Sequence, residues 1–395
     1  MVILFAFALF AAVSFLCLMV AFGVRRIARL KDSPPAEAGA PGVSIVVAAL
    51  NEADSIAPAL RSLLAIDYPK LEVIVVNDRS SDATPKILER MAAEHPALRV
   101  LHIAALPPGW LGKNHALQRG AEIANGEYLL FTDADVVFAP DAVARAAAYC
   151  SRHQVDHLTL LFDVVARTQL LRAMLLSFAV AFMARFRPWK LHLSPERYVG
   201  VGGFNMVRRS AYLALGGHAA IPLAVLDDLE LGRLIKQGGY SQHLLLGTDM
   251  VTVEWYRDTP ELVRGIEKNI FAGFDYRLSQ LAGATLLIFA ARVWPWIGLF
   301  VTHGFARWLY AATIVATLAL HAWLLRMNGW SLRCLAFAPV VPLIELWMWW
   351  RGTVLVLMRG GVTWRGTFYP LEEIRRAHVS AGARTRPCRA DSDHG

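Results

Sequence analysis

Short, mainly apolar runs recur in the first third of the chain, and each one stops at a cluster of polar residues. The runs cover residues 43–49, 71–76 and 128–131, and runs of this length are typical of strands buried on both faces of a sheet. Helix-like stretches follow the first two runs, at residues 54–65 and 84–95. This alternation predicts an α/β fold with a mostly parallel sheet and right-handed crossover connections.

The residues that follow these strands carry the first candidate chemistry. Asn51 and Glu52 follow the first strand, Asp78 ends the second, and Asp133 and Asp135 follow the third. The carboxyl ends of parallel strands meet at one edge of a sheet, where open α/β sheets bind their ligands. We therefore expect these residues to line one substrate-binding crevice.

Asp133 and Asp135 are separated by a single alanine. Residues two apart on an extended chain point to the same side, so both carboxylates can face one hard cation, Mg²⁺ or Mn²⁺, and the phosphates that it carries. Residues 391–393 repeat the spacing in a polar tail without a preceding strand, and we expect no site there. The buried strand is what makes the first pair a candidate metal site.

Other polar residues in this half have both a binding and a structural interpretation. Asp78 is placed to accept hydrogen bonds from a base or ribose, whereas Ser81 and Asp82 are more typical of helix caps. Lys113 lies near the start of a predicted helix, where a lysine opposes the helix dipole unless it meets an anion such as phosphate. A solvated surface lysine is an equal alternative at that position.

Two later segments complete the set of candidates. Residues 199–203, VGVGG, lack the third glycine of a dinucleotide fingerprint, so they predict no Rossmann cofactor site. Gly202 and Gly203 would let a substrate approach the backbone closely, although a plain turn is the default. Asp227 and Asp228 begin a predicted helix, where acids are ordinarily caps and dipole partners, but a carboxylate near an acceptor hydroxyl is also a suitable general base.

The remaining apolar segments are too long for strands. Residues 1–24 carry no charge and precede four basic residues, which predicts an uncleaved anchor with the next domain in the cytoplasm. Three more apolar segments lie at residues 281–301, 305–325 and 332–358. Residues 170–186 are also apolar, as expected for a core helix or one lying on the bilayer surface.

These segments give a predicted domain order. It runs from an anchor (1–24) through a basic and Pro/Gly linker (25–42), an α/β domain (43–275) and C-terminal membrane helices (279–358) to a basic, cytoplasmic, partly disordered tail (359–395). An odd number of spans would put that basic tail outside. Either the first segment lies in the interface, or the last one, with its two prolines and a glutamate, is a bent or re-entrant pair.

Composition agrees with a membrane protein and excludes other classes. With 56% hydrophobic residues, 18% charged residues and a mean hydropathy of +0.40, the chain is too apolar for an ordinary soluble protein. The net charge of +8 is scattered or flanks apolar spans, and no base-reading module is present, so we expect no nucleic-acid partner. The four cysteines lack paired or zinc-like spacing, which suits a reducing compartment.

Six ordered segments carry a family resemblance. They read VSIVVAALNEADSI, VIVVNDRSSDAT, GWLGKNHALQRG, YLLFTDADVVF, GGFNMVRRSAYLALGG and LDDLELGRLIKQGGY. Together, over roughly residues 43–260, they resemble the family 2 glycosyltransferases with the GT-A fold. The flanking spans make the chain most similar to the membrane-bound members that glycosylate lipids, including enzymes of carotenoid and hopanoid pathways.

The resemblance implies inverting transfer of a single sugar from a UDP- or GDP-linked donor to a membrane lipid of carotenoid, hopanoid or glycerolipid type. It implies that Asp78 binds the nucleobase, that Asp133 and Asp135 hold the ribose and the Mg²⁺ or Mn²⁺ on the diphosphate, and that Lys113 helps to hold that diphosphate. Asp228 matches the second acid of the family's Glu-Asp pair and would be the base. Asp227 stands where the family usually has glutamate, which leaves the choice between the two open. The enzyme would lie in the inner (cell) membrane with its catalytic domain facing the cytoplasm.

There are three alternative functions, of which the sequence disfavours the first and leaves the other two open. The Gln-x-x-Arg-Trp block of processive polymer synthases is absent; the corresponding residues 256–271 offer Arg264 and Lys268 as their obvious cations, which argues against polysaccharide synthesis. Transfer to a polyprenyl phosphate would use the same carboxylates without a strong base, because that acceptor is already ionised. A catalytically inactive transport or scaffold protein is the third alternative.

Overall fold

The computed structural model describes residues 1–35 and 39–384. Its contacts group the chain into two units. The helical unit contains Met1–Ile27, Asp163–Trp189 and Glu254–Leu371. Of the described residues, the sheet unit contains those within Ala28–Phe162, Lys190–Val253 and 372–384. Part of the predicted linker (36–38) and the end of the predicted tail (385–395) lie outside the described residues.

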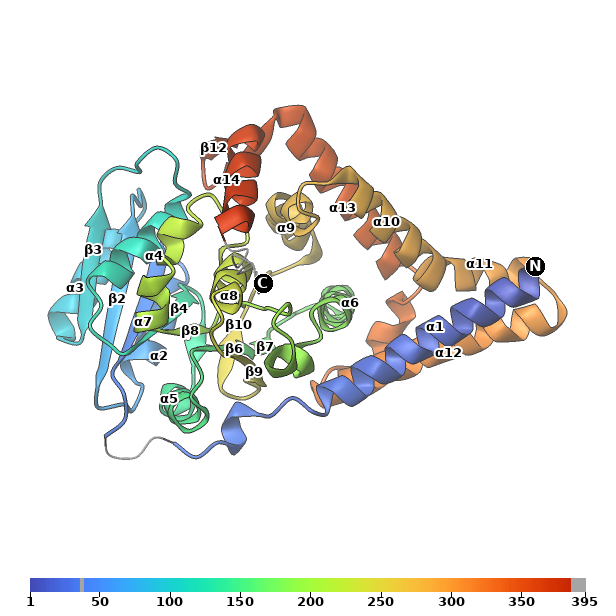
Figure 1. Ribbon diagram of the computed structural model, residues 1–395, viewed down its shortest axis with the longest axis horizontal. Coiled ribbons are helices and arrows are strands. Elements are labelled where there is room, and N and C mark those ends of the chain that lie inside the picture. The colour runs from blue at the N-terminus through green and yellow to red at the C-terminus, as the bar shows by residue number, and fades with distance from the viewer. Residues whose placement is uncertain (36–38, 385–395) are drawn as a thin grey trace, which may run out of the picture. The chain divides into compact units, whose positions relative to one another are not determined.

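The sheet unit is built on a seven-stranded sheet with the order β3-β2-β1-β4-β8-β6-β9 (Figure 1). β8 runs antiparallel to its neighbours β4 and β6, whereas the other neighbouring pairs are parallel. The strands are β1 Val43–Ala49, β2 Leu71–Asp78, β3 Leu98–Ile103, β4 Tyr128–Asp133, β6 His157–Leu161, β8 Asn205–Arg208 and β9 Gln242–Leu246. The prediction of an α/β, mostly parallel sheet is confirmed.

Short helices connect these strands. They are α2 Ile56–Leu64, α3 Thr84–Glu94, α4 Gly112–Glu122, α5 Ala142–His153, α7 Arg209–Ala214 and α8 Asp227–Gln237, with 3₁₀ turns at Leu30–Asp32 and Gly217–Ala220. A second strand pair joins β5 Val137–Phe138 to β10 Val251–Val253 in antiparallel register. In α2, buried residues at positions 56, 59, 60 and 63 form the single apolar stripe that packs a helix on a sheet.

One hydrophobic cluster joins α4 and α8 to the strands that carry the site. It contains Val46 of β1, Val76 of β2 and Phe131 of β4, together with Leu117 of α4 and Leu231 of α8. α4 approaches the sheet at Gly120, where a Cβ would lie only 2.4 Å from a methyl group of Val46. A residue larger than glycine would therefore push the helix away from the strands.

The helical unit is made of long apolar helices and short connecting pieces. The helices are α1 Val2–Val24, α6 Gln169–Phe186, α9 Thr259–Gly273, α10 Leu278–Ile288, α11 Trp294–Val301, α12 Gly304–Met327 and α13 Val341–Arg359. A π-helical turn, Phe289–Val293, joins α10 to α11, and 3₁₀ turns cover Pro188–Leu193 and Leu332–Phe337. The strands β7 Asp163–Val164, β11 Gly361–Trp364 and β12 Thr367–Pro370 and the helix α14 Leu371–Arg384 complete the described chain.

Five helical segments of the described chain are long and apolar enough to cross a membrane. They are Val2–Val24, Gln169–Leu193, Leu278–Val301, Gly304–Met327 and Val341–Arg359. The prediction of an N-terminal and several C-terminal apolar helices is thus confirmed. The last predicted segment differs in detail: residues 332–337 form a 3₁₀ turn, and Pro342 starts α13 instead of bending it.

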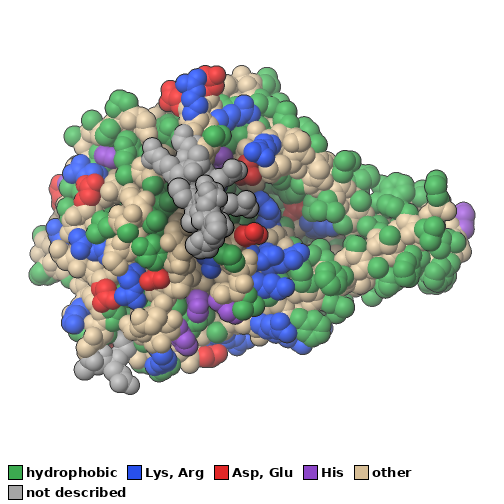
Figure 2. Space-filling view, in the orientation of Figure 1, with side chains coloured by type: hydrophobic (Ala, Val, Ile, Leu, Met, Phe, Trp, Pro, Cys, Tyr) green, Lys and Arg blue, Asp and Glu red, His purple; other side chains and the backbone are tan. Residues whose placement is uncertain are grey.

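Contacts inside the helical unit account for its apolar helix surfaces and for two charged residues within its apolar segments. α1 lies alongside α12, with Ala6 packed among Ala306, Leu309 and Tyr310, and Figure 2 shows mostly hydrophobic side chains along this pair. Arg292 and Glu345, which interrupt two of the apolar segments, form an ion pair at 2.6 Å. Each charge thereby neutralises the other in apolar surroundings.

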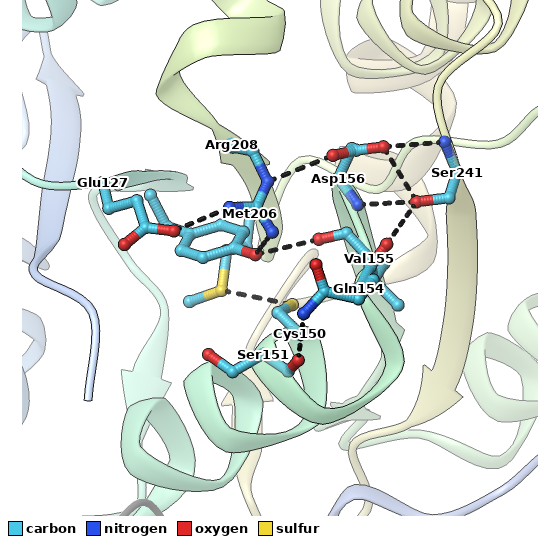
Figure 3. A network of polar contacts seen from close by, with 10 residues as sticks. Glu127, Cys150, Ser151, Gln154, Val155, Asp156, Met206, Arg208 and Ser241 are labelled. Atoms are coloured by element: carbon cyan, nitrogen blue, oxygen red, sulfur yellow. Dashed lines mark hydrogen bonds and ion pairs between the residues drawn. The ribbon is translucent and has the colours of Figure 1, made fainter. Parts of the chain in front are cut away.

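The edge of the sheet opposite the carboxyl ends of β1 and β4 is fixed by Arg208, at the end of β8. Figure 3 shows its guanidinium between Glu127, at 2.6 Å, and Asp156, at 3.1 Å, and it also donates to the Tyr128 hydroxyl at 2.5 Å. Asp156 in turn accepts hydrogen bonds from the backbone N–H and hydroxyl of Ser241, just before β9. This network ties the starts of β4, β6 and β9 to the end of β8.

We predict that Arg208→Met lowers the free energy of unfolding by about 2 kcal/mol, because it leaves the partly buried carboxylate of Asp156 and the hydroxyl of Tyr128 without their cationic partner. Thermal or chemical denaturation of the full chain would measure this loss. Arg152→Met, at an exposed arginine of α5, is the control and should change stability by less than about 0.5 kcal/mol. Equal effects of the two substitutions would contradict the prediction.

Candidate active site

The polar residues predicted at the strand ends lie at one edge of the sheet. Asp133 is the last residue of β4 and pairs in register with Ala48 of β1, so Asn51 and Glu52 follow directly on the neighbouring strand. Asp135 lies two residues beyond Asp133. Both Glu52 and Asp133 act electrostatically on the Asp135 carboxyl, which shows that these three acids are close together.

Lys113, in the first turn of α4, connects this edge to the start of α8. Its Nζ lies 2.8 Å from Oδ1 of Asp133 and 3.2 Å from Oδ2 of Asp227. Burial by itself would lower the pKa of Lys113, but the carboxylates of Asp133, Asp227 and Asp228 outweigh burial and hold the pKa well above its usual range. Lys113 is therefore a fixed cation of the site and not a solvated surface lysine.

Gly202 lies where these groups meet. A Cβ on Gly202 would be 3.0 Å from Oδ2 of Asp133, 3.5 Å from Oδ2 of Asp228 and 3.7 Å from Nζ of Lys113. Any side chain at this position would enter the space among the three charged groups. Gly203 faces away, since its Cβ would lie 2.3 Å from the ring of Phe162, and this gives it a packing reason to be glycine.

Two of the acids are held in a partly protonated range. Burial, followed by repulsion from Asp133 and Glu52, raises the pKa of Asp135 to about 7. Burial and the neighbouring Asp227 raise the pKa of Asp228 to about 7, although Lys113 acts in the opposite direction. Both carboxyls would ionise more readily if a cation approached them.

Asp78 lies at the same edge, at the end of β2, but its carboxylate has a partner that we did not predict. Nε and a terminal nitrogen of Arg79 donate to its two oxygens at 2.7 and 3.0 Å, with the Arg79 backbone in the left-handed region at φ 59°. Asp78 also contacts the start of α4, because a Cβ on Gly112 would lie 2.3 Å from its Oδ2. The sequence offers no signal for Arg79 beyond its position next to Asp78.

Asn51 and Glu52 join the loop after β1 to the loop after β2. Oδ1 of Asn51 accepts from the N–H of Ser81 at 2.8 Å, and the N–H of Glu52 donates to Oγ1 of Thr84 at 2.8 Å. The carboxylate of Glu52 accepts from the Ser55 hydroxyl at 2.7 Å. Asn51 therefore shapes the edge of the site, while Glu52 also contributes negative charge next to Asp135.

The acids at this edge suit a divalent cation that a substrate completes. Asp133 and Asp135 supply the oxygen ligands that Mg²⁺ and Mn²⁺ prefer, and the raised pKa of Asp135 indicates a concentration of negative charge. Within the described residues, no group of three His, Cys, Asp or Glu side chains is arranged to hold a metal. The residues thus fit a cation held by two carboxylates and by oxygens of a bound diphosphate.

Part of the chain that contains most of these residues matches a known protein family. Residues 44–216 match the family described as Glycosyl transferase family 2. These residues, somewhat less than half of the chain, are similar to a family 2 glycosyltransferase domain. The prediction of the enzyme class is confirmed at this level, and the domain contains Asp78, Lys113, Asp133, Asp135 and Gly202, whereas Asp227 and Asp228 lie beyond the matched residues.

Relatives of the glycosyltransferase domain differ in their products. Over 117 residues it is 38% identical to a beta-monoglucosyldiacylglycerol synthase of Trichormus variabilis, which is 29% of this chain and 25% of the synthase. Over 102 residues it is 35% identical to a poly-beta-1,6-N-acetyl-D-glucosamine synthase of Staphylococcus epidermidis, which is 26% of this chain and 23% of that protein. The match thus spans only about a quarter of the length of either relative.

A solved structure extends the likeness to the whole fold. A mannosyltransferase from Pyrobaculum calidifontis, determined with GDP-Man and Mn²⁺, aligns with 98% of this chain and 99% of its own, at a TM-score of 0.50 and 21% identity. At this identity the likeness shows the fold alone. It confirms a GT-A-like sheet together with long apolar helices at both ends of the chain.

We predict that Mn²⁺ alone binds about tenfold more tightly near pH 8 than near pH 6, because the cation competes with a proton on Asp135. Without metal, the pKa of Asp135 is about 7 in the folded state and lower in the unfolded chain, so the folded state keeps its proton up to a higher pH. Raising the pH through about 7 therefore removes stability, and Mn²⁺ restores it.

Thermal shifts with and without Mn²⁺ at both pH values would measure this effect. Asp135→Asn should abolish the shift, whereas Asp67→Asn, at an exposed aspartate of the same unit, should leave it unchanged. A shift that is independent of pH, or that survives Asp135→Asn, would place the cation elsewhere.

Proposed function

We propose that this protein is an inverting glycosyltransferase that moves one sugar from a nucleotide-diphosphate sugar to a lipid in the membrane. The observation that carries this proposal is the convergence of Asp133, Lys113, Asp227 and Asp228 around Gly202. Acids from the end of a strand and from the start of a helix thereby surround one fixed ammonium group. Such an arrangement can bind an anionic leaving group and also deprotonate a nucleophile.

The donor would lie along the carboxyl edge of β1, β2 and β4. Asp78, stiffened by Arg79, would accept hydrogen bonds from the nucleobase, and Asp133 would contact the ribose. A divalent cation held by Asp133 and Asp135 would neutralise charge on the departing diphosphate. Lys113 would shift part of its pairing from Asp133 to the diphosphate, since an ammonium group among acids is a ready partner for a competing anion.

Asp228 is the better candidate for the base. Asp227 is only 5% exposed, and its carboxylate is already engaged by Lys113. Oδ2 of Asp228 lies on the Gly202 side, and its raised pKa of about 7 matches a group that accepts a proton at neutral pH. As Asp228 takes the acceptor proton, the acceptor oxygen would bond to the anomeric carbon from the face opposite to the departing diphosphate. This displacement inverts the configuration of that carbon.

A lipid acceptor is supported by the rest of the chain. Five helices long and apolar enough to cross a membrane would keep the enzyme at the bilayer, where such an acceptor resides. The similar protein of Trichormus variabilis is named a beta-monoglucosyldiacylglycerol synthase. We therefore choose a glycerolipid, diacylglycerol, as the first acceptor to test. Basic residues that follow α1 support a cytoplasmic orientation of the sheet unit; they are Arg25, Arg26, Arg29 and Lys31.

The test uses the full chain in lipid nanodiscs that contain diacylglycerol, with Mn²⁺ and radiolabelled UDP-glucose or GDP-mannose. We expect label in a chloroform-soluble lipid, with transfer rising as the pH passes about 7 because Asp228 must be ionised to act as a base. Absence of labelled lipid with every donor, in nanodiscs supplemented with total bacterial lipid, would sink the proposal.

We predict that Asp228→Asn lowers the rate of transfer by about 10²–10⁴-fold, because the amide cannot accept the acceptor proton. Glu230→Gln, which removes another carboxylate from the same first turn of α8, is the matched control and should retain most of the rate. If polyprenyl phosphate is the acceptor, Asp228→Asn keeps its activity, because that acceptor is already ionised. This outcome would favour the alternative acceptor over a neutral lipid.

We predict that Lys113→Met weakens binding of Mn²⁺-UDP or Mn²⁺-GDP by about tenfold or more, because it removes the cation at the diphosphate. Isothermal titration calorimetry would measure the change. Lys86→Met, in α3, provides a lysine control in the same unit. Unchanged nucleotide affinity in Lys113→Met would assign this lysine to structure alone.

A further inference from the structure

Three buried polar side chains, of Gln242, His157 and Asn205, form hydrogen bonds with one another on three neighbouring strands of the sheet. One of these strands, β9, contacts α8. His157 of β6 is paired in register with Gln242 of β9 and with Val207 of β8. Asn205 lies two positions from Val207 and therefore points to the same face as His157. The exposed fractions of Gln242, His157 and Asn205 are only 1%, 0% and 2%.

Hydrogen bonds link these side chains in a line that ends at α8. Nε2 of Gln242 lies 2.6 Å from Nδ1 of His157, and Nε2 of His157 contacts Oδ1 of Asn205. Nδ2 of Asn205 then donates to the backbone carbonyl of Asp228 at 3.4 Å. One neutral tautomer of His157, protonated at Nε2, satisfies both ring contacts, and burial keeps the ring neutral by lowering its pKa to about 4.

Gln242 also joins α8 to the glycine loop at residues 199–203. Its Oε1 accepts from the N–H of Val199 at 3.0 Å. Its Nε2 lies 3.0 Å from the carbonyl oxygens of both Val199 and Gly232, which share the amide hydrogen that is not directed to His157. Val199 belongs to the loop that carries Gly202, and Gly232 belongs to the helix that carries Asp228. The side-chain amide of Gln242 therefore contacts both the loop that carries Gly202 and the helix that carries Asp228.

The loop and the helix touch through their backbones. A Cβ on Gly200 would lie 1.8 Å from the carbonyl oxygen of Asp228, and a Cβ on Gly232 would lie 2.0 Å from that of Val199. With no side chains between them, a small shift of either backbone changes the distance from Asp228 to Gly202 directly. The position of this acid thus depends on the groups that clamp the contact.

We propose that Gln242, His157 and Asn205 are positioning residues for Asp228. They hold the glycine loop against the first turn of α8 and thereby set the Asp228 carboxylate next to Gly202 and Asp133. They act through backbone atoms of the loop and the helix. The inference rests on the proposed function, because Asp228 is the proposed base.

A purely structural network makes a different prediction. If these residues only filled the core, their loss would lower stability, nucleotide binding and turnover together. A positioning role instead predicts a fall in kcat with little change in donor KM or nucleotide affinity, because the donor contacts lie on β2, β4 and α4. Misplacement of a reacting group by ~1 Å can cost about 10²-fold in rate.

The experiment compares near-isosteric variants in the full chain. Gln242→Glu loses the amide hydrogens that bind Val199 and Gly232, and Asn205→Asp loses the donor to Asp228 but keeps the acceptor for His157. Gln242→Met is a further variant that removes the hydrogen bonds without burying a charge. Gln237→Glu, at an exposed glutamine near the end of α8, is the matched control.

Four measurements are made on each variant in nanodiscs, and the first is the melting temperature. Hydrogen exchange followed by mass spectrometry reports on residues 199–203, on the first turn of α8 and, for reference, on β4. Transfer from radiolabelled UDP-glucose or GDP-mannose gives kcat and donor KM, and calorimetry gives the affinity for Mn²⁺-UDP and Mn²⁺-GDP.

We expect faster exchange in the loop and the first turn of α8 but not in β4, and a kcat lower by about 10²-fold with KM and nucleotide affinity within about twofold. Unchanged exchange, or a parallel loss of melting temperature, affinity and rate, would overturn the positioning role. Failure of the proposed function would give a different result, because the wild-type chain would then transfer no sugar. The exchange measurement would still test whether Gln242, His157 and Asn205 hold the glycine loop against α8. Exchange that rises without any fall in kcat would also overturn the inference.

Discussion

The candidate site depends on one partly buried ammonium group that is shared by acids from two distant parts of the chain. Lys113 of α4 pairs with Asp133 at the end of β4 and with Asp227 at the start of α8. These three residues belong to different elements, so the ion pairs align a strand and two helix starts with one another. Breaking them would leave acids partly buried without a counter-charge, which is costly.

The same arrangement indicates that an anionic ligand would need a cation to bind here. Asp133, Asp135, Asp227 and Asp228 set four carboxyl groups against the single charge of Lys113. A bare diphosphate entering this field would be repelled. A divalent ion at Asp133 and Asp135 would reverse the local balance, so that donor and metal would be expected to bind together.

Much of this fold could be predicted from the sequence, because its signals are local. Mainly apolar runs marked β1, β2 and β4, and the polar residue at the end of each strand followed from the parallel arrangement. Asp133 and Asp135 could be singled out because a buried strand precedes them. The long apolar helices were equally visible, since length and composition alone define them.

The contacts that depend on tertiary packing were not predictable. Nothing in the sequence indicates that Arg79 folds back on Asp78, or that Gly203 faces Phe162 while its neighbour Gly202 faces the acids. Lys113 could be assigned equally to phosphate or to solvent until its partners were known. Gln242 lies in an ordinary-looking strand, and its role emerges only when β9 is placed beside β6.

The ion pair between Arg292 and Glu345 has a consequence for biogenesis. In a bilayer, an isolated charge near the middle of an apolar helix is strongly disfavoured, and pairing removes much of that penalty. These two residues are 53 positions apart, so Arg292 leaves the ribosome well before its partner. If both segments cross a bilayer, the segment around Arg292 gains its counter-charge only once α13 has been synthesised, so we expect the membrane assembly of these two segments to be coupled.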